Sequence, residues 1–385
     1  MTVVVPEAVA AGRADTGPLR LVSIPAAEHA AWAAAHGGVS FLQCPSWGRV
    51  KEGWRSESLA WTGAEGRTVG AALVLYRDLP GLGRCFAYLP EGPVIDWAAP
   101  DLGRWLEPLT AALRSRGAFT VRIGPPPALR VWEAATIRAA VRAGAVTHLR
   151  DVLPDAVDPV GAMVGERLRV LGWEPAARDT QPRFTFRLPL AGRGLDAVRD
   201  GLSPQWRRNL RRAHGAGVEI VEGSAEDLES FYALVQETER RGAFDLGRGL
   251  AYYRRQFAEL NAELPGRMRL FLARYRGEVL AAHTLVTVGR GAWYLTGGSA
   301  SRGREVRPTN ALQWAMIQAA HGLGADEYDL RGVQPSLDRA GSDYGLLRWK
   351  LGTGGRVVEG SGEWELALNR PLHRAFRRYL ARRQG

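Results

Sequence analysis

Lysine is almost absent from this 385-residue sequence. Lysine and arginine together number 51, yet only Lys51 and Lys350 are lysines. An ammonium is a compact, titratable point charge, whereas a guanidinium is a planar fork that stays charged, so the two exchange poorly where geometry or proton transfer matters. Either a biased composition left these two lysines by chance, or both positions require an ammonium.

Cysteine and long apolar runs are also scarce. Cys44 and Cys85 are the only cysteines; they form no CxxC motif, so we expect two buried thiols and neither a disulfide framework nor a zinc site. No segment reaches the ~18 uninterrupted apolar residues of a membrane helix, and residues 1–18, an expected disordered lead, have no basic leader region. The sequence therefore predicts a cytoplasmic protein without a membrane span.

Missing motifs argue against several chemistries. Neither lysine follows a glycine, so the Gly-Lys-Ser/Thr of a phosphate-binding P-loop is absent and no ATP is implied. No HExxH or GxSxG occurs, and the seven histidines show no metal-ligand spacing, which leaves zinc hydrolysis and an elbow-serine esterase without support. We expect no metal and no cofactor.

Positive charge is what the chain has in excess. Its formal net charge is +11, which favours an anionic partner: a nucleic acid, a nucleotide-linked substrate or an acidic membrane surface. Charge alone does not choose among them. The length, with 46% hydrophobic residues, favours two domains over one.

The sequence repeats itself loosely. In both copies a run of small and aliphatic residues leads to an aromatic strand, a glycine-containing loop, a helix and another strand. Two related α/β domains account for this pattern. The first copy has expected strands at 69–76, 85–89 and 119–124 and a helix at 102–114; the second starts near Gly277 and has an aromatic strand at 293–294, a helix at 310–322 and a strand at 328–332.

The remaining segments complete the expected framework. A connector rich in Asp, Pro and Gly separates the copies, and the second domain begins with an alternating strand after it. The expected elements are a strand at 19–24, a helix at 26–35, a short helix with Trp47, Val50 and Trp54 on one face, a connector at 150–180 around a helix at 160–171, a strand at 184–188, a helix at 225–242 and an aromatic helix with Tyr252 and Tyr253.

Two expected helices are strongly basic. Ser203 caps and Pro204 opens the first, whose early cations oppose the helix dipole; an anion nearby would relieve this conflict, and a solvated basic face is the alternative. The second, at 372–383, is amphipathic and would lie on a phospholipid surface or pack on its own domain. The first helix carries Arg207, Arg208, Arg211, Arg212 and His214.

Lys350 stands in a distinctive setting. Residues 328–330 are expected to form a short strand, followed by a polar loop and a second strand at 346–351 that ends in Trp349 and Lys350. The expected strand is then followed by a loop that contains Gly352, Gly354 and Gly355. Functional groups gather where loops leave a sheet edge, which makes Lys350 a candidate functional residue.

The two-copy strand pattern resembles the acetyl-CoA-dependent N-acetyltransferase fold. Where that fold cradles pyrophosphate on a glycine-rich turn before a helix, this chain has residues 302–310, with one glycine and a proline. An acyl-transfer scaffold without its acyl-CoA loop indicates another acyl donor.

From about Phe41 to the C-terminus the chain resembles the FemABX family, which transfers an amino acid from aminoacyl-tRNA to the stem peptide of the peptidoglycan precursor. It is most similar to the FemX type of high-GC Gram-positive bacteria, which adds one glycine to the third-position side chain. The resemblance is carried by Pro45-Ser46-Trp47-Gly48-Arg49-Val50-Lys51, Ala87-Tyr88-Leu89-Pro90-Glu91-Gly92-Pro93-Val94, Trp206-Arg207-Arg208-Asn209-Leu210, Met268-Arg269-Leu270-Phe271, Tyr328-Asp329-Leu330-Arg331-Gly332 and Trp349-Lys350.

The resemblance implies an α/β (α+β) architecture of two acetyltransferase-like (GNAT-like) domains packed together. The first would span residues 1–180 and be completed by 356–385, as the final segment returns to it; the second would span 181–355. The implied partners are aminoacyl-tRNA, expected to be glycyl-tRNA, and UDP-MurNAc-pentapeptide or lipid II. We expect a monomer, and peripheral membrane contact is left open.

The resemblance also assigns site residues. Lys51 and Arg248 would hold the diphosphate of the nucleotide-linked precursor, and Trp54 and Tyr252 would line that site. Lys350, with Trp349 before it, is tied to the aminoacyl-ester chemistry. The two lysines that composition singles out are therefore the two that the resemblance selects.

Three departures from relatives bear on the acceptor. Some relatives place an aspartate, a suspected base, where this chain has Gly124, and a tyrosine expected two residues after Tyr294 is Thr296. The approach to Arg248 reads Asp245-Leu246-Gly247 instead of a more basic run.

The implied reaction is aminolysis of an activated ester, for which the protein must align an amine with a carbonyl. With no obvious side-chain base, we expect proton relay through substrate or tRNA groups and Lys350 as the donor to the oxyanion. A CoA-dependent N-acyltransferase, tRNA-dependent amide synthesis in a resistance or natural-product pathway, and a non-catalytic RNA-binding protein are the alternatives.

Overall fold

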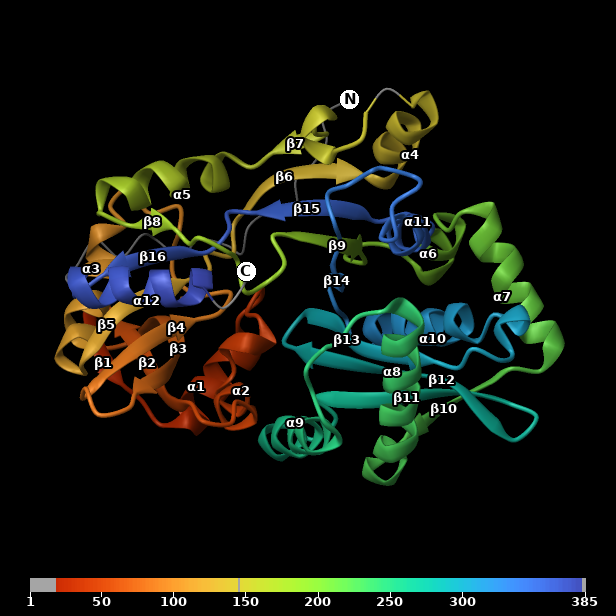
Figure 1. Ribbon diagram of the computed structural model, residues 1–385, viewed down its shortest axis with the longest axis horizontal. Coiled ribbons are helices and arrows are strands. Elements are labelled where there is room, and N and C mark those ends of the chain that lie inside the picture. Colours follow the sequence, from red (N-terminus) through yellow and green to blue (C-terminus); the bar gives the residue numbers. More distant parts are fainter. Residues whose placement is uncertain (1–18, 145, 383–385) are drawn as a thin grey trace. The chain divides into compact units, whose positions relative to one another are not determined.

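The computed structural model describes residues 19–144 and 146–382, so the expected disordered lead at 1–18 lies outside the described residues. The chain divides into two compact units (Figure 1). Unit 1 holds the described residues up to Pro127, then Pro159–Gln181, and those from Ser361 onward. Unit 2 holds Ala128–Asp158 and Pro182–Gly360.

These bounds differ from the expected ones in three places, the smallest being Gln181, which falls in unit 1. Residues 128–158 fall in unit 2, because β6 (Ala128–Glu133) pairs with β15 (Arg356–Gly360) and with β7 (Ala156–Val157). For the same reason the chain returns to unit 1 at Ser361 rather than at residue 356. The final segment, from Ser361 onward, belongs to unit 1.

Unit 1 is built on a seven-stranded sheet in the order β1-β2-β3-β4-β5-β16-β8. Strands β4 and β5 run parallel, with Leu89 opposite Ile123, and every other pair in this sheet is antiparallel. The strands are β1 (Arg20–Ser23), β2 (Arg55–Thr62), β3 (Thr68–Leu79), β4 (Arg84–Leu89), β5 (Ala118–Ile123), β8 (Glu174–Pro175) and β16 (Trp364–Ala367).

The core of unit 1 contains several tryptophans among its leucines and smaller apolar residues. Trp61 is fully buried, and its indole N–H donates to the Trp105 carbonyl at 2.9 Å, which satisfies the polar end of a large apolar side chain. Phe376 lies 5.4 Å from both the Phe86 and Phe119 rings, so the C-terminal helix packs on its own unit. The helices are α1 (Ala26–Ala35), η1 (Phe41–Gln43), α2 (Pro45–Val50), α3 (Gly103–Ser115), α5 (Pro159–Val170) and α12 (Arg370–Arg382).

Unit 2 contains a nine-stranded sheet in the order β10-β11-β12-β13-β14-β9-β15-β6-β7. Its parallel pair, β13 with β14, is in register only from Gly291–Trp293 against Glu327–Asp329; the later residues of β13 pair with β12. The two parallel strands therefore separate at their carboxyl ends. The further strands are β9 (Phe184–Pro189), β10 (Glu219–Gly223), β11 (Met268–Tyr275), β12 (Glu278–Val288), β13 (Gly291–Ser299) and β14 (Glu327–Gly332).

The helices of unit 2 follow local signals at their ends. The Ser203 hydroxyl accepts from Trp206 N at 3.3 Å and Pro204 opens α7, as its capping residues predict. The helices are α4 (Ala134–Ala143), η2 (Leu149–Asp151), α6 (Leu195–Asp200), α7 (Pro204–Ala216), η3 (Ala225–Asp227), α8 (Leu228–Gly242), α9 (Leu250–Glu263), η4 (Arg304–Val306), α10 (Pro308–Gly322) and α11 (Tyr344–Leu351).

The strand expected at 346–351 is wrong: this segment lies in the helix α11. Leu347, Lys350 and Leu351 are buried together while Leu346 is exposed, which is the three- and four-residue spacing of a helix face. Lys350 therefore lies at the end of a helix, not of a strand. None of the helices within the described residues is long and apolar enough to cross a membrane.

Candidate functional site

Lys350 is buried, with only 3% of its surface exposed. Its ammonium donates to the carbonyls of Leu330 at 2.7 Å, Arg331 at 3.2 Å and Gly332 at 2.7 Å. An ammonium has three N–H donors, so all of them are used by the end of β14. Loss of hydration lowers the pKa of Lys350 to about 8; the Asp329 carboxylate opposes this shift and the Arg331 cation adds to it.

The end of β14 bends so that these carbonyls converge. Arg331 adopts a left-handed backbone conformation, with φ of 62°, and its N–H donates to the Asp329 carboxylate at 2.5 Å. Between Asp329 and Gly332 the pairing with β9 shifts register. A single nitrogen can serve three carbonyls that point at one place, whereas the nitrogens of a planar guanidinium cannot all lie there.

Trp349 joins the end of α11 to the start of α7. Its ring centroid lies 5.2 Å from that of Trp206, and the Trp206 indole N–H donates to the Trp349 carbonyl at 2.8 Å. Ser203 N donates to the Gly352 carbonyl at 2.8 Å. A Cβ on Gly352 would lie 2.1 Å from Trp206 Cδ1, so this contact requires glycine.

A buried polar cluster lies on β12, β13 and α10 of the same unit. His283 is 4% exposed, and desolvation lowers its pKa to about 4, with a nearby Gln313 opposing, so its ring is neutral at pH 7. Burial also raises the pKa of Tyr294. A Cβ on Gly297 would lie 2.5 Å from the Tyr294 hydroxyl and 2.8 Å from His283 Nε2, so both heteroatoms converge on this glycine.

Sequence reasoning did not single out this cluster. Its only signal was the glycine pair after the aromatic strand, at Gly297 and Gly298. Thr296, the departure noted above, is buried; its N–H donates to the Thr284 hydroxyl and its carbonyl accepts from it, both at 3.1 Å. This hydroxyl holds β13 where the pairing with β12 shifts register.

In unit 1, Lys51 and Trp54 lie on either side of a turn that follows α2. Trp54 N donates to the Lys51 carbonyl at 3.3 Å, and the Lys51 ammonium lies 5.6 Å from the centroid of the Trp47 ring. The Trp54 ring lies 6.3 Å from Phe86 and 6.4 Å from Tyr88. Lys51 therefore lies beside the Trp47 ring, and Trp54 belongs to an aromatic group with Phe86 and Tyr88.

Tyr88 leads from this aromatic group to a buried carboxyl group. Its hydroxyl donates to Glu363 at 2.5 Å, Thr180 N donates to the other Glu363 oxygen at 2.8 Å, and Arg122 also approaches that oxygen at 3.4 Å. Burial raises the pKa of Glu363, and these three donors oppose the shift. Glu363 was not anticipated, because it belongs to the segment that returns to unit 1.

Gly124 lies beside Glu363 and leaves no room for the aspartate that the family resemblance leads one to expect there. A Cβ there would lie 2.9 Å from Glu91 N and 3.9 Å from Glu363 Cγ. A side chain at this position would therefore press against the backbone of the loop after β4, while a carboxyl group from another segment lies next to it.

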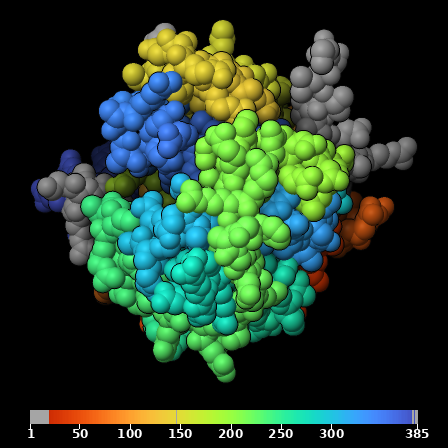
Figure 2. Space-filling model, turned by 90° about the vertical axis from the view of Figure 1, so that its right-hand side faces the viewer, coloured from red at the N-terminus to blue at the C-terminus, as the bar shows by residue number. Residues whose placement is uncertain are grey.

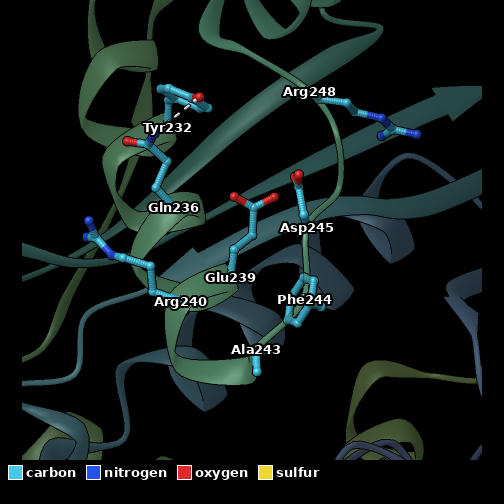
Figure 3. Close-up of a pocket in the computed structure, with 8 residues that line it drawn as sticks. All are labelled: Tyr232, Gln236, Glu239, Arg240, Ala243, Phe244, Asp245 and Arg248. Atoms are coloured by element: carbon cyan, nitrogen blue, oxygen red, sulfur yellow. Dashed lines mark hydrogen bonds between the residues drawn. The ribbon is translucent and has the colours of Figure 1, made fainter.

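In unit 2, Arg248 and Tyr252 lie together at the start of α9. The guanidinium carbon is 4.9 Å from the centroid of the Tyr252 ring. Glu239 accepts from Leu246 N at 2.8 Å and thereby ties the preceding loop to α8. Arg248 also lines a pocket of about 560 Å³ (Figure 3), together with Tyr232, Gln236, Glu239, Arg240, Ala243, Phe244 and Asp245.

The expected site residues thus form separate pairs. Lys51 and Trp54 belong to unit 1, whereas Arg248 and Tyr252, like Trp349 and Lys350, belong to unit 2. Both cysteines are buried and free, and no group of three or more metal-ligating side chains occurs within 19–144 and 146–382.

Comparison with known proteins decides the family. The FemAB family matches residues 24–273, and an acetyltransferase (GNAT) domain matches residues 204–350. The chain belongs to the FemAB family. The mixed α/β fold is acetyltransferase-like, as expected: a crystal structure of FemX has a TM-score of 0.77 and 21% identity, and the match covers 92% of this chain and 99% of that one.

Members of the family with similar sequences include two staphylococcal enzymes, each named lipid II:glycine glycyltransferase. The one from Staphylococcus saprophyticus is 24% identical over 416 residues, which cover 90% of this chain and 92% of the relative. The one from Staphylococcus aureus (strain USA300) is 23% identical over 421 residues, with the same coverage. This FemAB protein therefore aligns with them along nearly the whole length of both.

Proposed function

We propose that this FemAB protein transfers an amino acid, glycine, from aminoacyl-tRNA to the third-residue side-chain amine of a peptidoglycan precursor pentapeptide. The observation that carries the proposal is the similarity, across nine-tenths of the chain, to enzymes named lipid II:glycine glycyltransferase. The acceptor is either UDP-MurNAc-pentapeptide or lipid II. The acyl donor is an ester, so the reaction proceeds without ATP.

The loop before α10 supports a donor other than acyl-CoA. It contains the short helix η4, then Arg307 in a left-handed conformation with φ of 60°, then Pro308 at the first helical position. Proline lacks an N–H and the bulky Arg307 replaces a flexible glycine, so this helix start offers few backbone donors to a pyrophosphate.

Lys350 is the candidate group at the reacting ester. Aminolysis joins the acceptor nitrogen to the glycyl carbonyl carbon, the amine loses a proton, and the ribose hydroxyl of the tRNA leaves with one. An ammonium that exchanges one of its three carbonyl partners for the developing oxyanion would stabilise the transition state. Alignment of the amine with the ester supplies the larger part of the lowering of the activation barrier, roughly 7–11 kcal/mol.

Each unit offers a cation and an aromatic residue for binding the phosphate-bearing precursor. In unit 1 these are Lys51 and Trp54, joined by a backbone hydrogen bond, and in unit 2 they are Arg248 and Tyr252, whose guanidinium and ring are in contact. Charge-assisted hydrogen bonds to phosphate oxygens are about twice as strong as neutral ones. We therefore assign these four residues to precursor binding and Trp349 and Lys350 to the donor.

One experiment separates this function from its alternatives. Purified protein is mixed with labelled glycyl-tRNA, acetyl-CoA and either the UDP-linked or the lipid-linked pentapeptide, and the product mass is measured. We expect a glycyl product whose formation is abolished when RNase destroys the donor. An acetylated product, or a glycyl product that requires ATP in addition to preformed glycyl-tRNA, would contradict the proposal.

The second candidate function is tRNA-dependent amide synthesis on an amine other than that of the pentapeptide. The observation that favours it is Gly124, where some relatives have an acid and this chain has no room for one. Transfer of glycine to a small amine acceptor, with neither pentapeptide used, would select this candidate.

A further inference from the structure

One helix of unit 2 carries arginines without acidic partners. Arg208, Arg211 and Arg212 on α7 are exposed, and no carboxylate among the described residues forms an ion pair with any of them. Some other exposed arginines of this unit are paired, for example Arg290 with Asp326. What sets α7 apart is that three exposed arginines follow one another on the same helix. Arg208 lies three and four residues before Arg211 and Arg212, and like charges at these spacings repel within a helix. This arrangement costs stability unless an anion binds there.

The arginines occupy the outer face of α7. Its opposite face is buried through Trp206 and Ala213, and Asn209 donates to Asn310 of α10 at 3.2 Å. The helix also packs against η4, where Arg304 is another exposed arginine. Helix α7 lies at the right of Figure 1 and therefore faces the viewer in Figure 2.

The basic face begins beside the donor residues. The first turn of α7 is bonded to the end of α11 through the Trp206 indole and Ser203 N, which contact the Trp349 and Gly352 carbonyls. From there α7 continues for 13 residues, about 20 Å. A polyanion whose 3′ end reaches Lys350 could therefore follow this helix.

We propose that the outer face of α7 binds the phosphate backbone of the donor tRNA. This inference rests on the proposed function and adds to it the surface that receives the nucleic acid. The planar fork of arginine matches a phosphate, and contacts of this kind position a nucleic acid without reading its sequence. An acidic membrane is a poorer partner, because none of the large exposed apolar side chains of the described residues lies on α7.

The test is a triple variant in which Arg208, Arg211 and Arg212 become glutamine. Binding of uncharged tRNA is measured across a series of KCl concentrations, and KM and kcat are measured for glycyl-tRNA. We expect Kd and KM to rise about tenfold at low salt and the slope of log K against log salt to become shallower by about 2–3, while kcat stays unchanged. The matched control removes three exposed arginines elsewhere: Arg84→Gln, Arg114→Gln and Arg142→Gln.

A second donor separates contact with RNA from damage to the site. A glycylated 3′-terminal dinucleotide is too short to follow α7, so the triple variant should use it as well as the wild type does. Equal impairment with this short donor would mean that α7 only shapes the site around Lys350 and would overturn the proposal. An equal effect of the control variant would overturn it too, because net charge would then suffice.

The remaining outcomes show whether the proposed tRNA surface or the proposed function is wrong. Wild-type protein that binds tRNA through α7 but transfers no glycine would leave the surface standing and refute the proposed function. Wild-type protein that transfers glycine, with a triple variant unchanged in KM and salt slope, would refute the surface alone. Loss of binding to anionic phospholipid vesicles without loss of tRNA binding would assign α7 to a membrane instead.

Discussion

Lys51 in unit 1 and Lys350 in unit 2 are the chain's two lysines, and their surroundings are opposite. Lys51 is partly exposed at the end of a short helix, and its ammonium lies near the Trp47 ring. Lys350 is buried, and its ammonium holds three backbone carbonyls. Lys51 can contact a ligand with its charge. Lys350 stabilises the interior of unit 2, and it can contact a substrate only if the substrate replaces one of its three carbonyl partners.

The comparison explains why arginine did not replace both. At Lys350 the three acceptors converge on one point, which only an ammonium fits. Lys51 is only partly buried, and at such a position a guanidinium could also contact a phosphate. The requirement for lysine should therefore be strict in unit 2 and lenient in unit 1.

The largest expected effect tests this contrast directly. Lys350→Arg should lower the single-turnover rate about 10²–10³-fold, because the larger planar group cannot occupy the position of the ammonium. Lys51→Arg is the matched control and should stay within a few-fold of wild type. A Lys350→Arg enzyme with nearly normal rates would show that the buried lysine has no special role.

Next in size is the effect of removing the charges assigned to the precursor. Lys51→Ala and Arg248→Ala should each raise KM for the pentapeptide precursor about 10–100-fold, since one charge-assisted contact is worth about 1.5–3 kcal/mol when desolvated. The KM for glycyl-tRNA should not change. If both variants bind the precursor normally, the diphosphate does not lie at these residues.

The pH dependence of stability sharpens the comparison further. Because the pKa of Lys350 is lowered to about 8 in the folded protein, the unfolded chain binds more protons between pH 8 and the ordinary lysine pKa, so stability rises with pH across that window. Between pH 7.5 and 9.5 the gain from this residue is about 2 kcal/mol. Denaturant unfolding should show that the free energy of unfolding rises by this amount more in the wild type than in Lys350→Met between about pH 7.5 and 9.5. If the two proteins show the same dependence of stability on pH, the lowered pKa of Lys350 is contradicted.

The sequence predicted the elements whose signals are local. Ser203 and Pro204 mark the start of α7, and the alanine-rich run at 26–35 is a helix with those bounds. Residues 346–351 were misassigned because so short an apolar run fits either a strand or a helix, and only burial of Leu347 with Leu351 decides.

The sequence predicted which residues belong to the candidate site, but not the contacts that surround them. The rarity of lysine pointed to Lys51 and Lys350, but the carbonyl cage of Lys350 depends on the left-handed turn at Arg331, which no sequence pattern indicated. Glu363 and His283 were missed because tertiary packing buries them and so shifts their pKa values.

The smallest expected effect concerns Gly124 in unit 1, where the family resemblance leads one to expect an aspartate. Gly124→Ala should lower the free energy of unfolding by about 1 kcal/mol, because its Cβ would lie 2.9 Å from Glu91 N, a backbone atom that cannot rotate away. Gly215→Ala in α7 is the control: its Cβ meets nothing within 4 Å, and alanine should stabilise that helix by about 0.5–1 kcal/mol. Denaturant unfolding measures both variants. A Gly124→Ala protein as stable as wild type would mean that the loop after β4 yields easily, and that an acid at this position is absent for a reason other than space.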